Sequence, residues 1–309
     1  MHIVFMGTPE FAVVSLKKLV KDGFDIITVV TAPDKPKGRG LKVQVSPVKQ
    51  YALSVKIPIL QPEALDDESF LEELRAINAD LFVVVAFRIL PRSVFTIPAL
   101  GTINLHASLL PKYRGAAPIN WAIIRGESRT GVTTILINEK VDSGDLLLQR
   151  EVSISPQITA GELHDLLAES GANLLVETLQ RIFSKSIQPI PQNVLQITKA
   201  PKLKPAMCRV DFNQPAENVY NFIRGLSPNP GAYCYHDAKQ IKIYKAAASG
   251  KTESSAEPGQ IIAKSKDRFT VQCAKGSIDI LEVQLESKKR LSVRDFFNGY
   301  MVSVGDMLS

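Results

Sequence analysis

The sequence of this protein opens with the stretch His2-Ile3-Val4-Phe5-Met6-Gly7-Thr8-Pro9-Glu10. Its apolar part, residues 3–6, predicts a short buried strand. The turn that follows predicts the start of a helix, with Thr8 as its cap and Pro9 in its first turn. Further buried strands are predicted at residues 26–30, 81–86, 102–106 and 132–138. Short apolar strands with helical sequence between them indicate an α/β fold with a doubly wound, mostly parallel sheet.

A long helix is predicted to begin after residue 159. The tetrapeptide Thr159-Ala160-Gly161-Glu162 has the form of a capping box, which satisfies free N–H groups at a helix N-terminus. Five leucines at helical spacing are expected to face inward, namely Leu163, Leu166, Leu167, Leu174 and Leu175. This helix should end near Phe183 and close the first domain.

The pattern changes after this helix. Residues 184–206 contain four prolines, no acid and no sustained periodicity, which is typical of a semi-extended linker. A helix near residues 216–225 is followed by short alternating pieces at residues 240–244, 269–273 and 278–281. Such pieces, separated by turn-forming residues, predict a small antiparallel barrel. The expected parts are a first domain at 1–188, a basic Pro-containing linker at 189–206 and a second domain at 207–309.

The composition indicates a soluble protein with packed cores. Of the 309 residues, 45% are hydrophobic and 22% are charged. The longest wholly apolar run, residues 81–87, is far shorter than the roughly 20 residues that a membrane helix needs. The first residues lack the pattern of a secretory signal, and the three separated cysteines form neither a metal pair nor a complete disulfide framework. We therefore expect a cytoplasmic protein without a membrane partner.

The net charge of +6 is concentrated in two segments. Residues 32–50 contain five basic residues and one acid, and residues 184–208 contain four lysines and no acid. Localised positive charge is typical of a protein that binds a polyanion. The alternative interpretation is that these lysines only keep the surface solvated.

Polar side chains lie on the strand predicted at residues 102–106 and in a later turn. Asn104 and His106 alternate along it, so they share one face and point toward the ligand-binding region of an open α/β sheet. Asp142 lies in a later turn, where it could join them or simply cap that turn. An amide, an imidazole and a carboxylate suit acyl transfer without a covalent intermediate, as oxyanion donors, proton shuttle and charge-setting group.

Several other chemistries lack their motifs. Gly7-Thr8-Pro9-Glu10 has no second and third glycine of the dinucleotide-binding fingerprint, so NAD is not expected. There is no H-E-x-x-H and no His/Cys cluster, so no metal is expected. The sequence also has no G-x-S-x-G elbow and no catalytic cysteine candidate, which disfavours a hydrolase with a covalent intermediate.

Together these motifs resemble the signature of the folate-dependent formyltransferases. The signature consists of Asn104-Leu105-His106, Ser108-Leu109-Leu110-Pro111-Lys112-Tyr113-Arg114-Gly115 and Val141-Asp142-Ser143-Gly144-Asp145. Within that superfamily, residues 5–11, the loop at residues 33–40 and the second domain resemble the methionyl-tRNA formyltransferase family. The similarity runs over nearly the whole chain.

The resemblance implies a Rossmann-like catalytic domain followed by an OB-like barrel that serves tRNA. It implies 10-formyltetrahydrofolate as the co-substrate and initiator methionyl-tRNA as the acceptor, for the initiation of translation, in a protein that we expect to be a monomer. Asn104, His106 and Asp142 match the catalytic trio of the family. Neither NAD nor a metal is implied.

The resemblance also assigns binding residues. Ser108, Leu109, Leu110 and Pro111 match the loop that contacts folate, and Arg39 matches a basic residue that approaches tRNA. We also expect Ile89 and Leu90 to bind folate. The further residues expected to bind tRNA are Lys35, Lys37, Lys42, Lys202 and Lys204. The sequence departs from the family pattern in two places. Phe87-Arg88 precedes Ile-Leu-Pro where Tyr-Gly is usual, and Tyr113 stands where Trp is common.

Three alternatives remain open at this point. The first is another folate formyltransferase that acts on a sugar-nucleotide amine or a purine precursor. The loop at residues 33–40, here called the basic loop, and the second domain disfavour it. The second is a non-catalytic RNA-binding protein, which would not need the three polar groups in one cleft. The third is a nicotinamide-dependent oxidoreductase, which the absent glycines disfavour.

Overall fold

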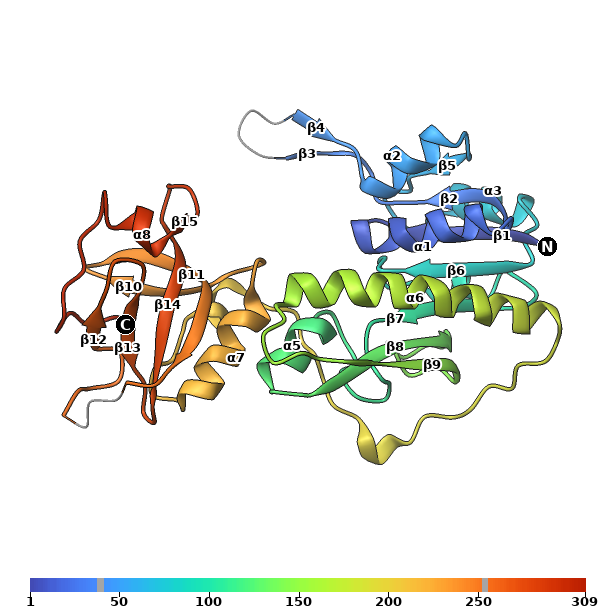
Figure 1. Cartoon of the computed structure of the whole chain (residues 1–309). Helices are drawn as coiled ribbons and strands as arrows, with labels where there is room; N and C mark the ends of the chain where they lie inside the picture. The colour runs from blue at the N-terminus through green and yellow to red at the C-terminus, as the bar shows by residue number, and fades with distance from the viewer. Residues whose placement is uncertain (38–41, 252–254) are drawn as a thin grey trace. The chain divides into compact units, whose positions relative to one another are not determined.

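Figure 1 shows the computed structural model of the chain, which describes residues 1–37, 42–251 and 255–309. The chain forms two compact units. The first comprises residues 1–116, 130–153 and 164–200, and the second comprises 117–129, 154–163 and 201–309. The domain bounds at 188 and 206 stay a prediction; in the structure, residues 189–200 have their contacts within the first unit.

The first unit is built on a seven-stranded sheet with the strand order β5-β2-β1-β6-β7-β8-β9. Its strands are β1 (His2–Gly7), β2 (Asp25–Val30), β5 (Ile59–Leu60), β6 (Leu81–Val85), β7 (Thr102–His106), β8 (Arg129–Leu136) and β9 (Leu146–Ser153). Neighbouring strands from β5 to β7 are parallel, and β8 joins β7 in the antiparallel sense. All residues of β6 are buried, as expected for a strand covered on both faces. The predicted α/β class with a mostly parallel sheet is confirmed.

Helices and one hairpin complete the first unit. The helices are α1 (Glu10–Lys21), α2 (Pro47–Ser54), α3 (Glu68–Ala76), α4 (Arg92–Phe95) and α6 (Ala160–Phe183), whose first turn belongs to the second unit. A separate antiparallel hairpin between β2 and α2 consists of β3 (Lys35–Lys37) and β4 (Lys42–Gln44). Figure 1 shows α6 running along β7, the strand that bears Asn104 and His106.

The start of α6 has the predicted capping box. The Glu162 carboxylate accepts a hydrogen bond from the backbone N–H of Thr159 (2.8 Å), and the Thr159 hydroxyl oxygen accepts one from the N–H of Glu162 (3.3 Å). Further along, a Cβ atom on Gly171 would lie 2.8 Å from Cδ2 of Leu105. The missing side chain therefore allows α6 to pack closely against β7.

Two local predictions were wrong. Thr8 does not cap α1, because Pro9 with its extended backbone is the N-cap residue and Thr8 lies one position too early. Leu166 is 51% exposed, whereas the other four leucines predicted to face inward from α6 are at least nine-tenths buried. Because each residue turns the helix by about 100°, Leu166 lies about 60° outside the arc that these four leucines span.

The second unit is built on an antiparallel sheet with the order β10-β11-β14-β13-β12, and β15 pairs with β14. Its strands are β10 (Ala232–His236), β11 (Lys239–Ser249), β12 (Ile261–Lys264), β13 (Phe269–Gln272), β14 (Ser277–Leu285) and β15 (Leu291–Ser292). Its helices are α5 (Pro118–Ile124), α7 (Ala216–Leu226) and α8 (Val293–Phe296). Apolar residues of α7 and of the strands share one core, as a small barrel-like domain requires.

The helices and the cysteines bear on the expectations about membranes and thiols. In the part of the chain that the structure describes, no helix is both long and apolar enough to cross a membrane. The three cysteines are buried and not paired with one another. Burial raises the pKa of Cys234 and of Cys273 to about 12, so both thiols stay protonated at neutral pH and are poor nucleophiles.

Candidate active site

β7 carries two of the predicted catalytic side chains. Asn104 and His106 lie two positions apart on it, so their side chains share one face of the strand. His106, the last residue of β7, is 7% exposed, and Asn104 is partly exposed. Within the described ranges, the Asn104 carboxamide makes no hydrogen bond. Its N–H groups are therefore available to a substrate oxygen.

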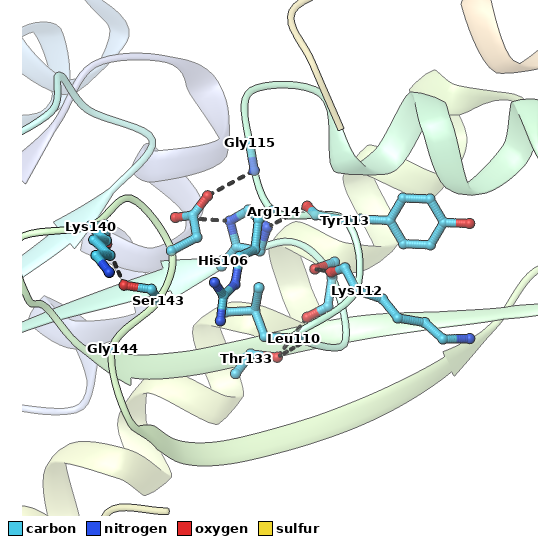
Figure 2. A network of polar contacts seen from close by, with 12 residues as sticks. His106, Leu110, Lys112, Tyr113, Arg114, Gly115, Thr133, Lys140, Ser143 and Gly144 are labelled. Carbon is cyan, nitrogen blue, oxygen red and sulfur yellow. Dashed lines mark hydrogen bonds and ion pairs between the residues drawn. The ribbon is translucent and has the colours of Figure 1, made fainter. Parts of the chain in front are cut away.

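The imidazole of His106 is held from both sides (Figure 2). Its Nε2 lies 3.0 Å from the backbone carbonyl oxygen of Tyr113, and its Nδ1 lies 3.6 Å from a carboxylate oxygen of Asp142. Because a carbonyl oxygen only accepts hydrogen bonds, Nε2 carries a hydrogen and donates it. Nδ1 is thereby left as the nitrogen that can take up or release a proton.

Asp142 reaches His106 from the turn between β8 and β9. One carboxylate oxygen faces the imidazole, and the other accepts a hydrogen bond from the backbone N–H of Gly115 (2.9 Å). The turn folds tightly on itself, because a Cβ atom on Gly144 would lie 1.6 Å from the carbonyl oxygen of Leu136. The side chains of Asp142 and His106 are 12% and 8% exposed. A carboxylate at this distance, shielded from water, stabilises a positive charge on the ring when Nδ1 is protonated.

Left-handed backbone conformations occur at two residues that contact His106 and at Ala86, which follows β6. Ala86, Tyr113 and Asp142 each have a positive φ, at 46°, 61° and 52°. Left-handed conformations are unfavourable for non-glycine residues and persist where the surrounding structure over-determines them, often at active sites. Tyr113 and Asp142 contact His106 directly, so two of these strained positions orient the imidazole.

The sequence-based reasoning missed two residues that hold the site in place. Gln192 donates to the carbonyl oxygens of Asp142 (3.0 Å) and Gly144 (2.7 Å), and its own side-chain oxygen accepts from the Arg114 guanidinium (2.6 Å). The Thr198 hydroxyl oxygen accepts from the N–H of Tyr113 (2.8 Å). Both belong to the segment interpreted as a linker, and that segment instead fixes the loops that carry Tyr113 and Asp142. Only the polar character of these residues among prolines could have pointed to them.

The loop predicted to contact folate is tied to β8 and β9. The Thr133 hydroxyl donates to the Ser108 carbonyl oxygen (2.6 Å), and Gln149 donates to the Leu110 carbonyl oxygen (2.8 Å). Ser108, Leu110 and Pro111 are buried, and Leu109 is half-buried. The Ser108 hydroxyl donates to the carbonyl oxygen of Lys112 (2.7 Å). Folate contact by residues 108–111 stays a prediction, and their observed contacts give the loop a defined shape.

A second loop, after β6, contains the other two predicted folate residues. Ile89 is 75% exposed, whereas Leu90 is 8% exposed and packs in the apolar core. Arg88, the departure from the family pattern, donates to the carbonyl oxygens of Glu63 (2.9 Å) and Pro62 (2.7 Å). Arg88 thus ties the loop after β6 to the chain that leaves β5. Contact of Ile89 and Leu90 with folate stays a prediction.

The basic residues predicted to meet tRNA are distributed over both units. Lys35 is exposed in the first unit, and Lys202 and Lys204 are exposed in the second. Lys37 and Lys42 lie in β3 and β4, of which the backbone is described, and Arg39 lies outside the described residues. All six assignments stay predictions. No group of His, Cys, Asp and Glu suited to hold a metal ion occurs among the described residues.

Comparison with known proteins extends the likeness from the site to the whole chain. The Formyl transferase family matches residues 1–179, and the Formyl transferase C-terminal domain matches residues 202–301. A methionyl-tRNA formyltransferase from Caldanaerobacter subterraneus subsp. tengcongensis is 46% identical over 310 residues, covering 100% of both chains. One from Flavobacterium johnsoniae is 46% identical over 308 residues, covering 98% of this chain and 97% of that protein.

A solved structure shows the same fold at lower identity. An N-formyltransferase from Helicobacter canadensis, in complex with folinic acid and dTDP-3-aminofucose, has a TM-score of 0.67 at 21% identity, covering 90% of this chain and 98% of that one. At this identity the likeness shows a shared fold. The two relatives that are 46% identical over the full length are both methionyl-tRNA formyltransferases. The chain therefore belongs to the methionyl-tRNA formyltransferase family.

Proposed function

We propose that this protein transfers the formyl group of 10-formyltetrahydrofolate to the α-amino group of methionine on initiator methionyl-tRNA, for the initiation of translation. The observation that carries the proposal is the pairing of His106 with Asp142 beside the free carboxamide of Asn104, in a chain alike to methionyl-tRNA formyltransferases over its full length. The partners are folate and tRNA. In this proposal the protein acts in the cytoplasm as a monomer, and one chain supplies all three catalytic candidates.

The acceptor amine needs no strong base to become a nucleophile. α-Amino groups have pKa values near 7.7–8.0 in model compounds, so roughly a tenth are neutral at pH 7. The amine nitrogen attacks the formyl carbon, and the carbonyl oxygen becomes an oxyanion. The Asn104 carboxamide donates a hydrogen bond to that oxyanion, and one such donor is typically worth about 3–4 kcal/mol.

His106 and Asp142 handle the proton that the amine loses. Nε2 of His106 donates its hydrogen to the carbonyl oxygen of Tyr113, so Nδ1 receives the proton from the amine, directly or through a water molecule. Asp142 stabilises the resulting imidazolium. When the intermediate collapses, the bond from the formyl carbon to the folate nitrogen breaks, and that nitrogen takes up the proton from His106. The ring is thereby returned to its neutral form.

A substrate comparison tests the proposed function. The purified protein is incubated with 10-formyltetrahydrofolate and, in turn, initiator methionyl-tRNA, elongator methionyl-tRNA, free methionine and a dTDP-amino sugar. We expect formylation of the initiator methionyl-tRNA well above that of the other three. Preferred formylation of the amino sugar would replace the proposed acceptor, and no formylation of any amine would overturn the enzymatic assignment.

A first prediction concerns Arg39 in the basic loop. Arg39→Ala is expected to raise the KM for methionyl-tRNA several-fold, because one contact to a backbone phosphate is lost. The slope of log KM against log salt concentration should become shallower by about 0.7–0.9 for that one contact. Steady-state kinetics at several salt concentrations measure both quantities. Lys21→Ala, at an exposed lysine on α1, is the control; an Arg39→Ala slope equal to that of the control would remove Arg39 from the tRNA surface.

A second prediction concerns Arg88 and the formyl donor. Arg88→Met removes both hydrogen bonds to the chain after β5 while keeping much of the apolar stem. We expect the KM for 10-formyltetrahydrofolate to rise about fivefold, since the loop bearing Ile89 and Leu90 loses its tie, and kcat to change little. The control is Arg92→Met, at an exposed arginine of α4 paired with Glu139 at the surface. A donor KM that stays the same in both variants would show that Arg88 does not shape the folate site.

A further inference from the structure

We propose that Asp34, Lys49 and Gln61 form a positioning cluster, which holds the base of the β3–β4 hairpin and so sets where the basic loop meets the acceptor RNA. The inference rests on the proposed function, because it concerns how that loop is presented to tRNA. None of the three residues would touch a substrate. Their role is to act through the hairpin.

The cluster is a closed set of polar contacts from three segments of the first unit. The Lys49 ammonium group donates to a carboxylate oxygen of Asp34 (2.5 Å) and to the side-chain oxygen of Gln61 (2.6 Å). The Gln61 amide nitrogen donates to the other carboxylate oxygen of Asp34 (2.9 Å) and to the backbone carbonyl oxygen of Ala32 (2.8 Å). The side chains of Lys49 and Asp34 are 19% and 24% exposed, so the pair is partly shielded from water.

These contacts lie where the hairpin joins the rest of the unit. Asp34 immediately precedes β3, and the first pair of the hairpin is Lys35 with Gln44. On the returning side, the hydroxyl groups of Ser46 and Thr31 are hydrogen-bonded (2.8 Å), and the Ser46 oxygen accepts from the backbone N–H of Lys49 as the cap of α2. Both ends of the hairpin are therefore fixed, one through Asp34 and one through Ser46.

The charges show why Lys49 is not simply another cation for RNA. Hydrogen bonds from Lys49 and Gln61 lower the pKa of Asp34, so its carboxylate is ionised at neutral pH. The positive charge of Lys49 is balanced at 2.5 Å by that carboxylate. A lysine used in this way contributes little net field toward a polyanion. Its contribution is geometric, and it differs from that of the other basic residues of segment 32–50.

The experiment compares Lys49→Met with Lys21→Met, a matched removal of one lysine charge at an exposed position of α1. For Lys49→Met we expect the KM for methionyl-tRNA to rise about fivefold, while kcat and the KM for 10-formyltetrahydrofolate stay within about twofold of the wild type. The slope of log KM against log salt should equal that of the wild type, because no phosphate contact is lost. Lys21→Met should change none of these quantities.

Two results would overturn the proposal. A shallower salt slope for Lys49→Met, like that expected for Arg39→Ala, would mean that Lys49 itself contacts phosphate. An unchanged KM for methionyl-tRNA would mean that the cluster does not affect the hairpin's role. Failure of the wild-type protein to formylate methionyl-tRNA would instead overturn the proposed function, so the two failures are distinguishable.

A second variant guards against loss of folding. Gln61→Met changes no charge and removes the contacts to Asp34, Lys49 and Ala32. We expect the same selective rise in the KM for methionyl-tRNA, with a thermal midpoint measured alongside for every variant.

A double variant tests whether Asp34 and Lys49 act as one unit. If they do, the KM for methionyl-tRNA of Asp34→Ala/Lys49→Met should not exceed that of the more impaired single variant, because each single change leaves a partly shielded charge without its partner. Strict additivity of the two effects would contradict the cluster.

Discussion

Replacement of His106 by alanine is expected to lower the single-turnover rate of formyl transfer by about 100-fold or more. The variant loses the Nδ1 atom that faces Asp142 and the Nε2–H that donates to Tyr113. No other imidazole lies in this site, because the remaining histidines are His2, His164 and His236, in β1, α6 and β10. The proton must then leave the amine through solvent, which is the step that a positioned base accelerates.

The control for this variant is a second histidine that is paired with a carboxylate. His2 lies on β1 with its Nδ1 2.7 Å from a carboxylate oxygen of Asp25, and both side chains are more than half exposed. His2→Ala should leave the single-turnover rate unchanged. A His106→Ala variant that folds normally and keeps more than about a tenth of the wild-type rate would remove His106 from proton transfer.

Replacement of Asp142 by asparagine is expected to lower the same rate by about 100-fold. Asparagine has nearly the same shape and keeps one side-chain oxygen that can accept from the Gly115 N–H. The variant therefore isolates the negative charge, which is the feature that stabilises a protonated His106. The rate is measured in a single turnover with saturating donor, and the thermal midpoint should stay close to that of the wild type.

The same turn offers a matched control for Asp142. Asp145 is exposed, lies three residues further along and is expected to have no catalytic role. Asp145→Asn should therefore keep the wild-type rate, although it removes the same charge from the same turn. Equally lowered rates for the two variants would show that the overall charge of the turn matters and that Asp142 has no special role.

Residues whose roles follow from strand geometry were predictable from the sequence. Asn104 and His106 share a face because side chains alternate along any strand, whatever surrounds it. The sheet itself could be predicted for the same reason, since runs such as residues 81–85 are apolar throughout and must be buried on both faces. The capping box before α6 is a local pattern of four residues, and it too depends on nothing distant.

Contacts that depend on loop paths were not predictable. The carbonyl oxygen of Tyr113 reaches His106 only because residues 107–112 take a particular course, and the backbone carbonyl leaves no trace in the sequence. Gln192 and Thr198 lie in a Pro-rich segment without periodicity, so no pattern indicates that they fix Asp142 and Tyr113. Thr8 shows the limit even for local patterns, because the residue type suits a cap that the helix places one position later.

The contacts of Gln192 and Thr198 also decide how short an engineered catalytic fragment can be. A truncation after residue 188, where the sequence suggests that the catalytic domain ends, would delete both residues and leave the carbonyl oxygens of Asp142 and Gly144 without their shared donor. Cutting the gene after residue 200 would keep these contacts, together with the hydrogen bonds that join Arg114 to Thr198 and Ala200. Constructing a minimal enzyme therefore means retaining the stretch that, by composition alone, looks dispensable.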